Sequence, residues 1–358
     1  MPASSVDTFF ACSLMVILVV SAMAATVKVV QPHIDQISEK RRAERSEGLS
    51  KYLLQSTGIP IDWGKLEHDI PIAFGLASGA RGPYELDPDK VSRLNGENIH
   101  SITYTDIMST LGIEDMSLSI QLRPLFDVSA SLASTRSTET EATYTFQLST
   151  TKSGLPLSTW LKCYAVVGAH IGNTSSSTAS NGIGFANLSL PNSLHGPALL
   201  VAFAKAKASS HLISFTVLSF GHNSDTPQPN KTFVRLSPLN HSLNVSFRQP
   251  NLTVSKAYVF TCNYQFNLSE VATGPETIEY IIPKLVDSSP MILTINGDNA
   301  STAFAEWTAY PQLPLQIGPD FTDVTTRSQS VTSTHVVNIN SVLYEFLTTC
   351  QSVMDQNA

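Results

Sequence analysis

An uncharged, mostly apolar stretch near the N-terminus constrains this chain more than any other feature. It lies between Asp7 and Lys28 and reads TFFACSLMVILVVSAMAATV. At about 1.5 Å of rise per residue, a helix of this length spans roughly 30 Å, the hydrocarbon thickness of a bilayer. We therefore expect residues 8–27 to cross the membrane once and to contact lipid, with the rest of the chain on one side.

The remaining composition limits the classes of partner. The chain has 358 residues and a net charge of −7, and the part after the anchor is long enough for two domains of ordinary size. Without a basic stripe to neutralise phosphates, nucleic acid is not an expected partner. The one basic cluster, Lys40 to Arg42 with Arg45, alternates with glutamates and predicts a solvated helix face, with lipid headgroups as the alternative contact.

Four cysteines are present, and none has the spacing of a zinc site. Cys12 lies in the apolar stretch. Cys163 and Cys262 each lie in a strand-like run, which predicts two separate buried thiols; a Cys163–Cys262 disulfide is the alternative, and Cys350 is another partner for Cys262.

Asparagine sequons favour an extracellular position for the folded part. They are candidate glycosylation sites at Asn173, Asn187, Asn230, Asn240, Asn244, Asn251, Asn267 and Asn299. The alternative is that a chain rich in Ser and Thr forms such triplets by chance.

Two signals near the anchor argue against a membrane-bound protein with an extracellular C-terminal part. Lys and Arg follow the apolar stretch and none precedes it, which by the positive-inside rule argues against an extracellular C-terminal part. Ala22-Met23-Ala24 has the form of a signal-peptidase site, and cleavage there would release a secreted protein. Because the apolar pattern continues beyond it and no basic residue leads it, we expect the anchor to be retained.

The helical pattern runs from Phe9 to about Gln55, with Pro32 expected to kink it. Residues 57–115 are repeatedly broken by Gly and Pro and predict a small collar with two short helices. One begins where Asp87 caps and Pro88 takes the first position, and the other ends at Gly112.

After Met116, apolar residues recur at every second position, and this pattern predicts short strands that follow one another without helices between them. The predicted fold is mainly β: a long N-terminal transmembrane helix (1–56), the collar (57–115), an Ig-like antiparallel β-sandwich (116–225) and a second β-sandwich-like domain (231–358). In the second sandwich, the alternating apolar residues from Tyr258 to Phe266 are expected on one face, and Val331 to Phe346 supplies late strands.

Several segments resemble archaeal pilin-like and pseudopilin-like surface proteins. They are GIPIDWG (58–64), FGLAS (74–78), YELDPDKVSRLN (84–95) and YTDIMSTLGIEDMSLSIQL (104–122), together with the style of the anchor. The resemblance implies that Trp63, Gly75, Leu76, Ala77, Lys90, Leu111 and Gly112 are structural positions of the collar. The residues before the anchor depart from the usual prepilin cleavage pattern, which argues against processing and filament assembly.

No catalytic constellation can be nominated. The histidines are scattered, Asp87-Pro88-Asp89 lacks the rest of an EF-hand loop, and Gly75 to Gly79 has the wrong order for a nucleophile elbow. Trp63, Trp160 and Trp307 could form a sugar-stacking surface, with burial in the core as the ordinary outcome. We therefore expect a non-enzymatic, single-pass cell-envelope protein without cofactor or metal, with envelope or pilin-like proteins as partners; the alternative is an adhesin-like binding module for glycans or proteins.

Overall fold

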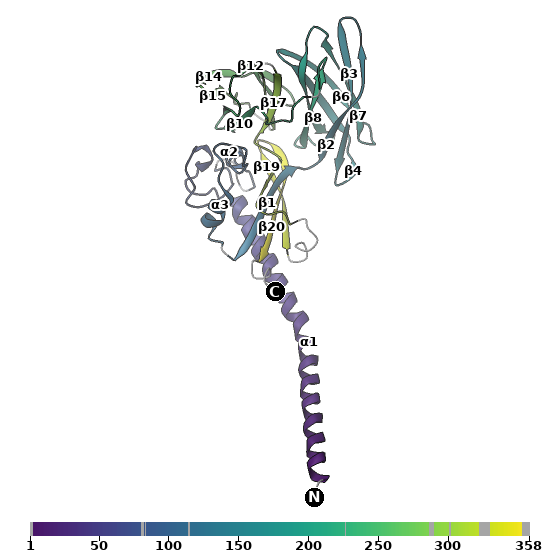
Figure 1. The fold of residues 1–358 in the computed structure, drawn as a ribbon, viewed down its shortest axis with the longest axis vertical. Helices are drawn as coiled ribbons and strands as arrows, with labels where there is room; N and C mark the ends of the chain where they lie inside the picture. The colour runs from purple at the N-terminus through teal and green to yellow at the C-terminus, as the bar shows by residue number, and fades with distance from the viewer. Residues whose placement is uncertain are drawn as a thin grey trace.

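The computed structural model describes residues 3–79, 82, 84–113, 115–225, 227–285, 290–300, 302–321 and 330–352. The chain is mainly β, with one long N-terminal helix and several antiparallel sheets, as the sequence predicts. Figure 1 shows a helix projecting from one end of the molecule, a small unit at its base, and two strand-built bodies beyond that unit.

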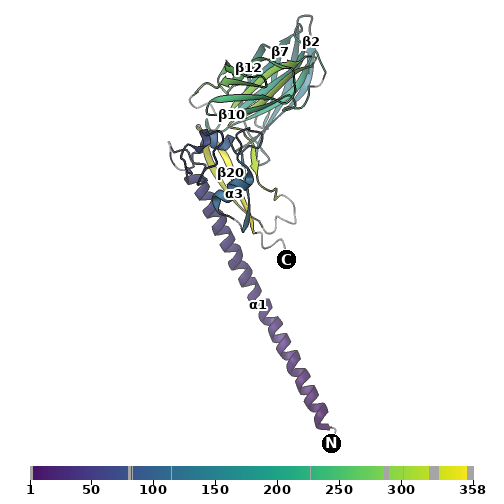
Figure 2. The same ribbon diagram turned by 60° about the vertical axis from the view of Figure 1, so that its left-hand side comes forward.

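Among the described residues, the helical elements all precede the first strand. Their bounds are α1 Ala3–Gln55, the 3-10 helix η1 Trp63–Lys65, α2 Pro88–Ser92 and α3 Tyr104–Leu111. Helix α1 continues through Pro32 as one element of 53 residues. Its N-terminal part stands free of the rest, whereas its last turns lie against the base of the molecule in Figure 1 and Figure 2.

The base of the molecule is a sheet built from distant parts of the chain. Its strands run in the order β18 (Leu315–Ile317), β1 (Met116–Pro124), β20 (Val342–Ser352) and β19 (Ser330–Ile339), with every pair antiparallel. The last turns of α1 pack on β19 and β20. Ser46, Ser50, Leu53 and Leu54 are buried there, at the spacing of one helix face.

This pairing corrects the strand grouping expected from the sequence. The sequence predicts that β1 belongs to the first sandwich and β19 and β20 to the second, but Leu118 pairs with Cys350 and Leu122 with Phe346. The expected ranges 116–225 and 231–358 therefore each include strands of the base sheet. Both sandwiches are inserted between β1 and β18, because the chain leaves the base after one strand and returns to it near the end.

The first sandwich follows β1. One sheet contains β2 (Asp127–Ser137), β3 (Glu141–Lys152) and β4 (Leu155–Pro156), with β7 (Ile183–Pro191) paired to β3; the other runs β6 (His170–Ser177), β5 (Thr159–Val167), β8 (Gly196–Ala206), β9 (Ile213–His222). Alternate residues such as Tyr144, Phe146 and Leu148 fill the core between the two sheets, as the period of two predicts.

The second sandwich follows the first. One sheet runs β10 (Val234–Leu239), β11 (Ser242–Phe247), β15 (Thr277–Ile281), β14 (Ser269–Thr273), and the other runs β13 (Gln265–Asn267), β12 (Leu252–Phe260), β16 (Met291–Asn299), β17 (Thr302–Tyr310). The expectation that Tyr258 to Phe266 share one face is wrong. Thr261 and Tyr264 close a turn, with the amide of Thr261 donating to the Tyr264 carbonyl, and this turn leaves Tyr264 and Phe266 exposed.

The two sandwiches share a buried interface. Strand β8 is buried on both faces, so that Leu200 and Ala202 face the first core while Val201 and Phe203 face the second sandwich. Such burial on both faces is the reason that a strand reads as a continuous apolar run. Tyr164 of β5 crosses the interface, because its ring lies 5.0 Å from that of Phe260 and its hydroxyl donates to the Thr261 carbonyl at 3.1 Å.

Candidate membrane anchor and interaction surfaces

The apolar part of α1 covers Asp7–His33, a segment of 27 residues whose most apolar 18-residue window has a mean hydropathy of 2.4 and is not buried inside the molecule. Phe9 and Met15 are each 73% exposed, and Ile17 is 67% exposed. Leaving a large apolar side chain in water costs roughly 1.5–3 kcal/mol. The length, composition and exposure of this one N-terminal helix are therefore those of a membrane anchor.

The polar groups inside the segment are satisfied by the helix itself. The hydroxyls of Ser13, Ser21 and Thr26 donate to the carbonyls of Phe9, Leu18 and Ala22 at 2.8 to 2.9 Å. Since a bilayer core offers no water to hydroxyl groups, such internal bonds allow these residues to face lipid.

Beyond the apolar segment, polar contacts fix the helix to the base. Arg45 donates two hydrogen bonds to the carboxylate of Asp115, at 2.6 and 2.8 Å, and Glu47 lies 3.4 Å from the imidazole of His335 on β19. Both acidic groups have a lowered pKa, mainly through the hydrogen bonds from Arg45 to Asp115 and from Lys51 to Glu47. These contacts orient the free half of α1 relative to the sheet.

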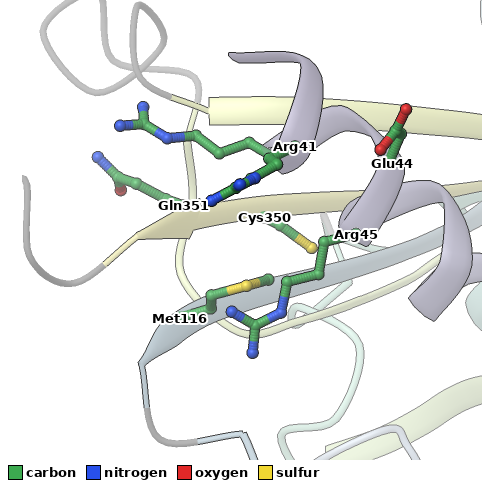
Figure 3. A pocket seen from close by; sticks show the side chains of 7 residues that line it. Arg41, Glu44, Arg45, Met116, Cys350 and Gln351 are labelled. Atoms are coloured by element: carbon green, nitrogen blue, oxygen red, sulfur yellow. The ribbon is translucent and has the colours of Figure 1, made fainter. Parts of the chain in front are cut away.

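The basic cluster lies on the membrane side of this junction. Arg41, Arg42 and Arg45 line a cavity of about 530 Å³ between α1 and the ends of β1 and β20, together with Cys350. Figure 3 shows the Arg45 side chain extending toward Met116 and the Cys350 sulfur pointing toward the helix. The side chains of Arg41 and Lys40 are exposed, as a solvated face or a face in contact with lipid headgroups requires.

The collar carries two buried cations. The Lys90 ammonium is fully buried and donates to the carbonyls of Thr57 and Ala77, at 2.7 and 2.8 Å. The Arg93 guanidinium donates to three carbonyls, those of Trp63, Asp69 and His100. Burial lowers the pKa of both side chains. Backbone carbonyls rather than carboxylates hold these charges, which ties the irregular loops together.

The positions taken from the pilin-like resemblance lie together in this collar. Trp63, Leu76, Ala77 and Lys90 are buried, and the Trp63 indole N–H donates to the Gly75 carbonyl at 3.0 Å. Leu111 and Gly112 end α3, where Gly112 has a φ of 63°. Asp87 caps α2 through the amides of Asp89 and Lys90, as the sequence predicts.

Asp89 connects the collar to the second sandwich. Its carboxylate accepts hydrogen bonds from the Tyr310 hydroxyl at 2.6 Å and from the Asn240 amide at 2.8 Å. Burial raises the pKa of Asp89 to about 6, against the lowering effect of the Tyr310 hydrogen bond. The sequence gives no sign of this role for Asp89, because its partner lies 221 positions away and leaves no local signal.

The cysteines are free, which corrects the disulfide alternatives. Cys163 faces the core of the first sandwich, whereas Cys262, in the turn after β12, packs against the opposite face of that sheet. Cys350 belongs to the base sheet, so it does not meet Cys262 either. Burial raises the pKa of Cys163 to about 12, so this thiol is an unreactive core residue. Only Cys163 and Cys350 are buried; Cys262 is half-buried and Cys12 is exposed on α1.

The tryptophans do not form one surface. Trp63 is buried in the collar and Trp307 is half-buried at the interface between the sandwiches, whereas Trp160 is 58% exposed. Over the described residues, His, Cys, Asp and Glu side chains form no group of three able to hold a metal ion.

The candidate glycosylation sites are distributed over both sandwiches. Asn173, Asn187, Asn240, Asn251 and Asn267 are exposed, and Asn230, Asn244 and Asn299 are half-buried. Asn187 projects opposite the buried Ala186 and Leu188, as the alternation predicts. Asn230 differs, because both polar atoms of its half-buried amide bond the backbone of Trp307, which ties this side chain to β17.

Comparisons with known proteins leave the family open. No family model and no curated protein matches the chain. Among solved structures, HBP35 of Porphyromonas gingivalis is 12% identical, with a TM-score of 0.20 over 60% of this chain and 68% of that one. Human GIVD cytosolic phospholipase A2 is 7% identical, with a TM-score of 0.15 over 66% of this chain and 33% of its own. Scores this low carry no argument about function.

Proposed function

We propose that the protein is a single-pass cell-envelope protein whose sandwiches lie outside the cell, where they have a structural or interaction role. The observation that carries the proposal is the continuity of α1, which is free and apolar over Asp7–His33 and packed on β19 and β20 over its last turns. A helix that is an anchor at one end and packs on the base sheet at the other holds the head, meaning the collar, the base sheet and both sandwiches, in a defined orientation above the bilayer.

A pilin-like subunit is the more specific form of this proposal. It is supported by the long helix that ends on an antiparallel sheet and by the buried collar residues Trp63 and Lys90. The exposed sequons at Asn173 and Asn187 support the extracellular side. In this arrangement the partners are lipid along residues 8–27 and other envelope proteins around the head.

The anchor is tested by placing charge in the middle of the apolar segment. An Ile17→Asp/Val20→Asp variant puts two carboxylates at mid-bilayer depth, at a cost of roughly 2.5–3.5 kcal/mol each. The matched control is Ile37→Asp/Ala43→Asp, which makes similar changes at exposed positions of α1 beyond the apolar segment.

After an alkaline carbonate wash, we expect the wild type and the control to stay in the membrane pellet and the Ile17/Val20 variant to leave it. Retention of all three proteins would show that the apolar segment is not what holds the chain in the membrane.

A second candidate function is an adhesin-like binding module. It is favoured by the exposure of Trp160 beside three lysines, an arrangement that a purely structural subunit does not require.

A further inference from the structure

A cleft opens where the first sandwich, the turn after β12 and the turn after β8 meet. It has a volume of about 400 Å³, and its lining includes Trp160, Lys162, Lys205, Lys207 and Asn263. Cleft residues come from both sandwiches, so the shared interface between them fixes its shape.

Strand register explains why the cleft is open. Trp160 pairs with Lys205 and Lys162 pairs with Phe203 across β5 and β8, and paired residues project to the same face of a sheet. Farther along β5, Tyr164 on that face is covered by Phe260 of the second sandwich. The second sandwich covers this face only as far as the turn after β12, so the end of the face that carries Trp160 is left exposed.

The aromatic floor of the cleft is a single oriented ring. Trp160 is 58% exposed, and the Lys207 ammonium lies 4.9 Å from the ring centroid. An exposed indole held in this way offers a flat apolar surface, and the apolar C–H face of a pyranose ring stacks on such a surface.

The charge in the cleft is positive although the chain as a whole is acidic. Within the described residues, no carboxylate forms an ion pair with Lys162, Lys205 or Lys207. Burial raises the pKa of the Cys262 thiol, and the charges of Lys205 and Lys162 act against that rise, so both ammonium groups act on the same part of the cleft. An ammonium has three donors. Lys162 directs one to the Asn173 side chain and Lys207 one to the Thr178 carbonyl.

Polar groups complete the lining. Ser175, Ser210 and Asn263 border the same space, and Ser175 pairs with Lys162, so it projects to the cleft face of the sheet. Such groups can exchange hydrogen bonds with the hydroxyls of a sugar, whereas a purely apolar partner would leave them unpaired.

We propose that this cleft binds an acidic polysaccharide, with one sugar ring stacked on Trp160 and uronic-acid carboxylates facing Lys162, Lys205 and Lys207. The inference deepens the proposed function and rests on it, because the proposed function places the head outside the cell, where acidic polysaccharides occur. Trp160 supplies the stacking surface, and the lysines select charged chains over neutral ones by charge complementarity.

The test uses the full chain in lipid nanodiscs, with oligogalacturonate as the acidic probe, an uncharged galactan as the neutral probe and polyglutamate as the acidic peptide probe. Binding is measured by calorimetry. The variants are Trp160→Ala and the triple Lys162→Gln/Lys205→Gln/Lys207→Gln. The matched control is Lys152→Gln/Lys231→Gln/Lys256→Gln, which removes the same charge from exposed positions outside the cleft.

We expect oligogalacturonate to bind, and the Trp160 variant and the triple variant each to weaken binding by about tenfold or more, while the control stays within about twofold. Galactan should bind weakly. The proposal is overturned if both cleft variants bind like the control, if galactan binds as tightly as oligogalacturonate, or if polyglutamate does. Binding in nanodiscs does not depend on the side of the membrane that the head occupies in cells. A failure to bind would therefore overturn the cleft proposal and leave the proposed topology unaffected.

Discussion

The carboxylate of Asp89 accepts a hydrogen bond of 2.6 Å from the hydroxyl of Tyr310, and this contact joins the collar helix α2 to strand β17 of the second sandwich. The carboxylate is almost fully buried, and its pKa is raised from 3.8 to about 6, chiefly by burial. An acid with a higher pKa in the folded state binds its proton more tightly there than in the unfolded state. The stability of this junction therefore falls as pH rises from about 4 to 6.

The first prediction concerns the Asp89→Asn variant, which keeps an acceptor oxygen and removes the titration. Relative to the wild type, its free energy of unfolding should increase between pH 4 and pH 7 by roughly 1–3 kcal/mol. Thermal unfolding across this pH range measures the difference. The control is Asp127→Asn, the same change at an exposed aspartate of the first sandwich. A difference from the wild type that does not change with pH would contradict the assignment.

The second prediction concerns the buried ammonium of Lys90. A Lys90→Met variant keeps the stem of the side chain but leaves the carbonyls of Thr57 and Ala77 without their donor. We expect a loss of roughly 2–4 kcal/mol in the free energy of unfolding, measured by chemical denaturation. Lys65→Met, at an exposed site of the same collar, should change stability by less than about 0.5 kcal/mol. Equal effects of the two variants would argue against a stabilising role for the Lys90 contacts.

The third prediction concerns close packing at Gly75. A Cβ atom at this position would lie 2.3 Å from the Ser56 carbonyl oxygen, so backbone must move in a Gly75→Ala variant. We expect a loss of roughly 1–3 kcal/mol. At Gly48 in α1, a Cβ atom meets nothing within 4 Å, and Gly48→Ala should instead stabilise the protein by about 0.5–1 kcal/mol. Thermal melts of the two variants in one detergent should therefore shift in opposite directions.

The fourth prediction concerns the thiols. Cys163 faces the core of the first sandwich, Cys262 packs on the other side of that sheet, and Cys350 lies in the base sheet, so the protein should contain no intramolecular disulfide. Denatured without reductant, it should react with maleimide at all four cysteines, as judged by intact-mass spectrometry. Labelling of only two cysteines would mean that a disulfide forms.

Local features of the fold could be read from the sequence. The long helix, the Asp87 cap, the Gly112 terminus and the alternation of Leu118, Ile120 and Leu122 all depend on neighbouring residues, and all agree with the structure. Pro32 removes one hydrogen bond and crowds the preceding turn, yet α1 continues through it as one element.

Long-range features could not be read in the same way. The pairing of Leu118 with Cys350 and the bond between Asp89 and Tyr310 join positions more than 200 residues apart, and no periodicity records them. The cleft was missed for a related reason. Trp160 could be named as a candidate, but the lysines that surround it come from two strands whose register is set only in the folded sheet.

The most direct test of the central claim is protease accessibility of the head in intact cells, followed by recovery of the membrane fraction. We expect added protease to digest the two sandwiches while a fragment that includes residues 8–27 stays in the membrane. A head protected until the cells are lysed, or a soluble mature protein that begins at Ala25, would contradict the account.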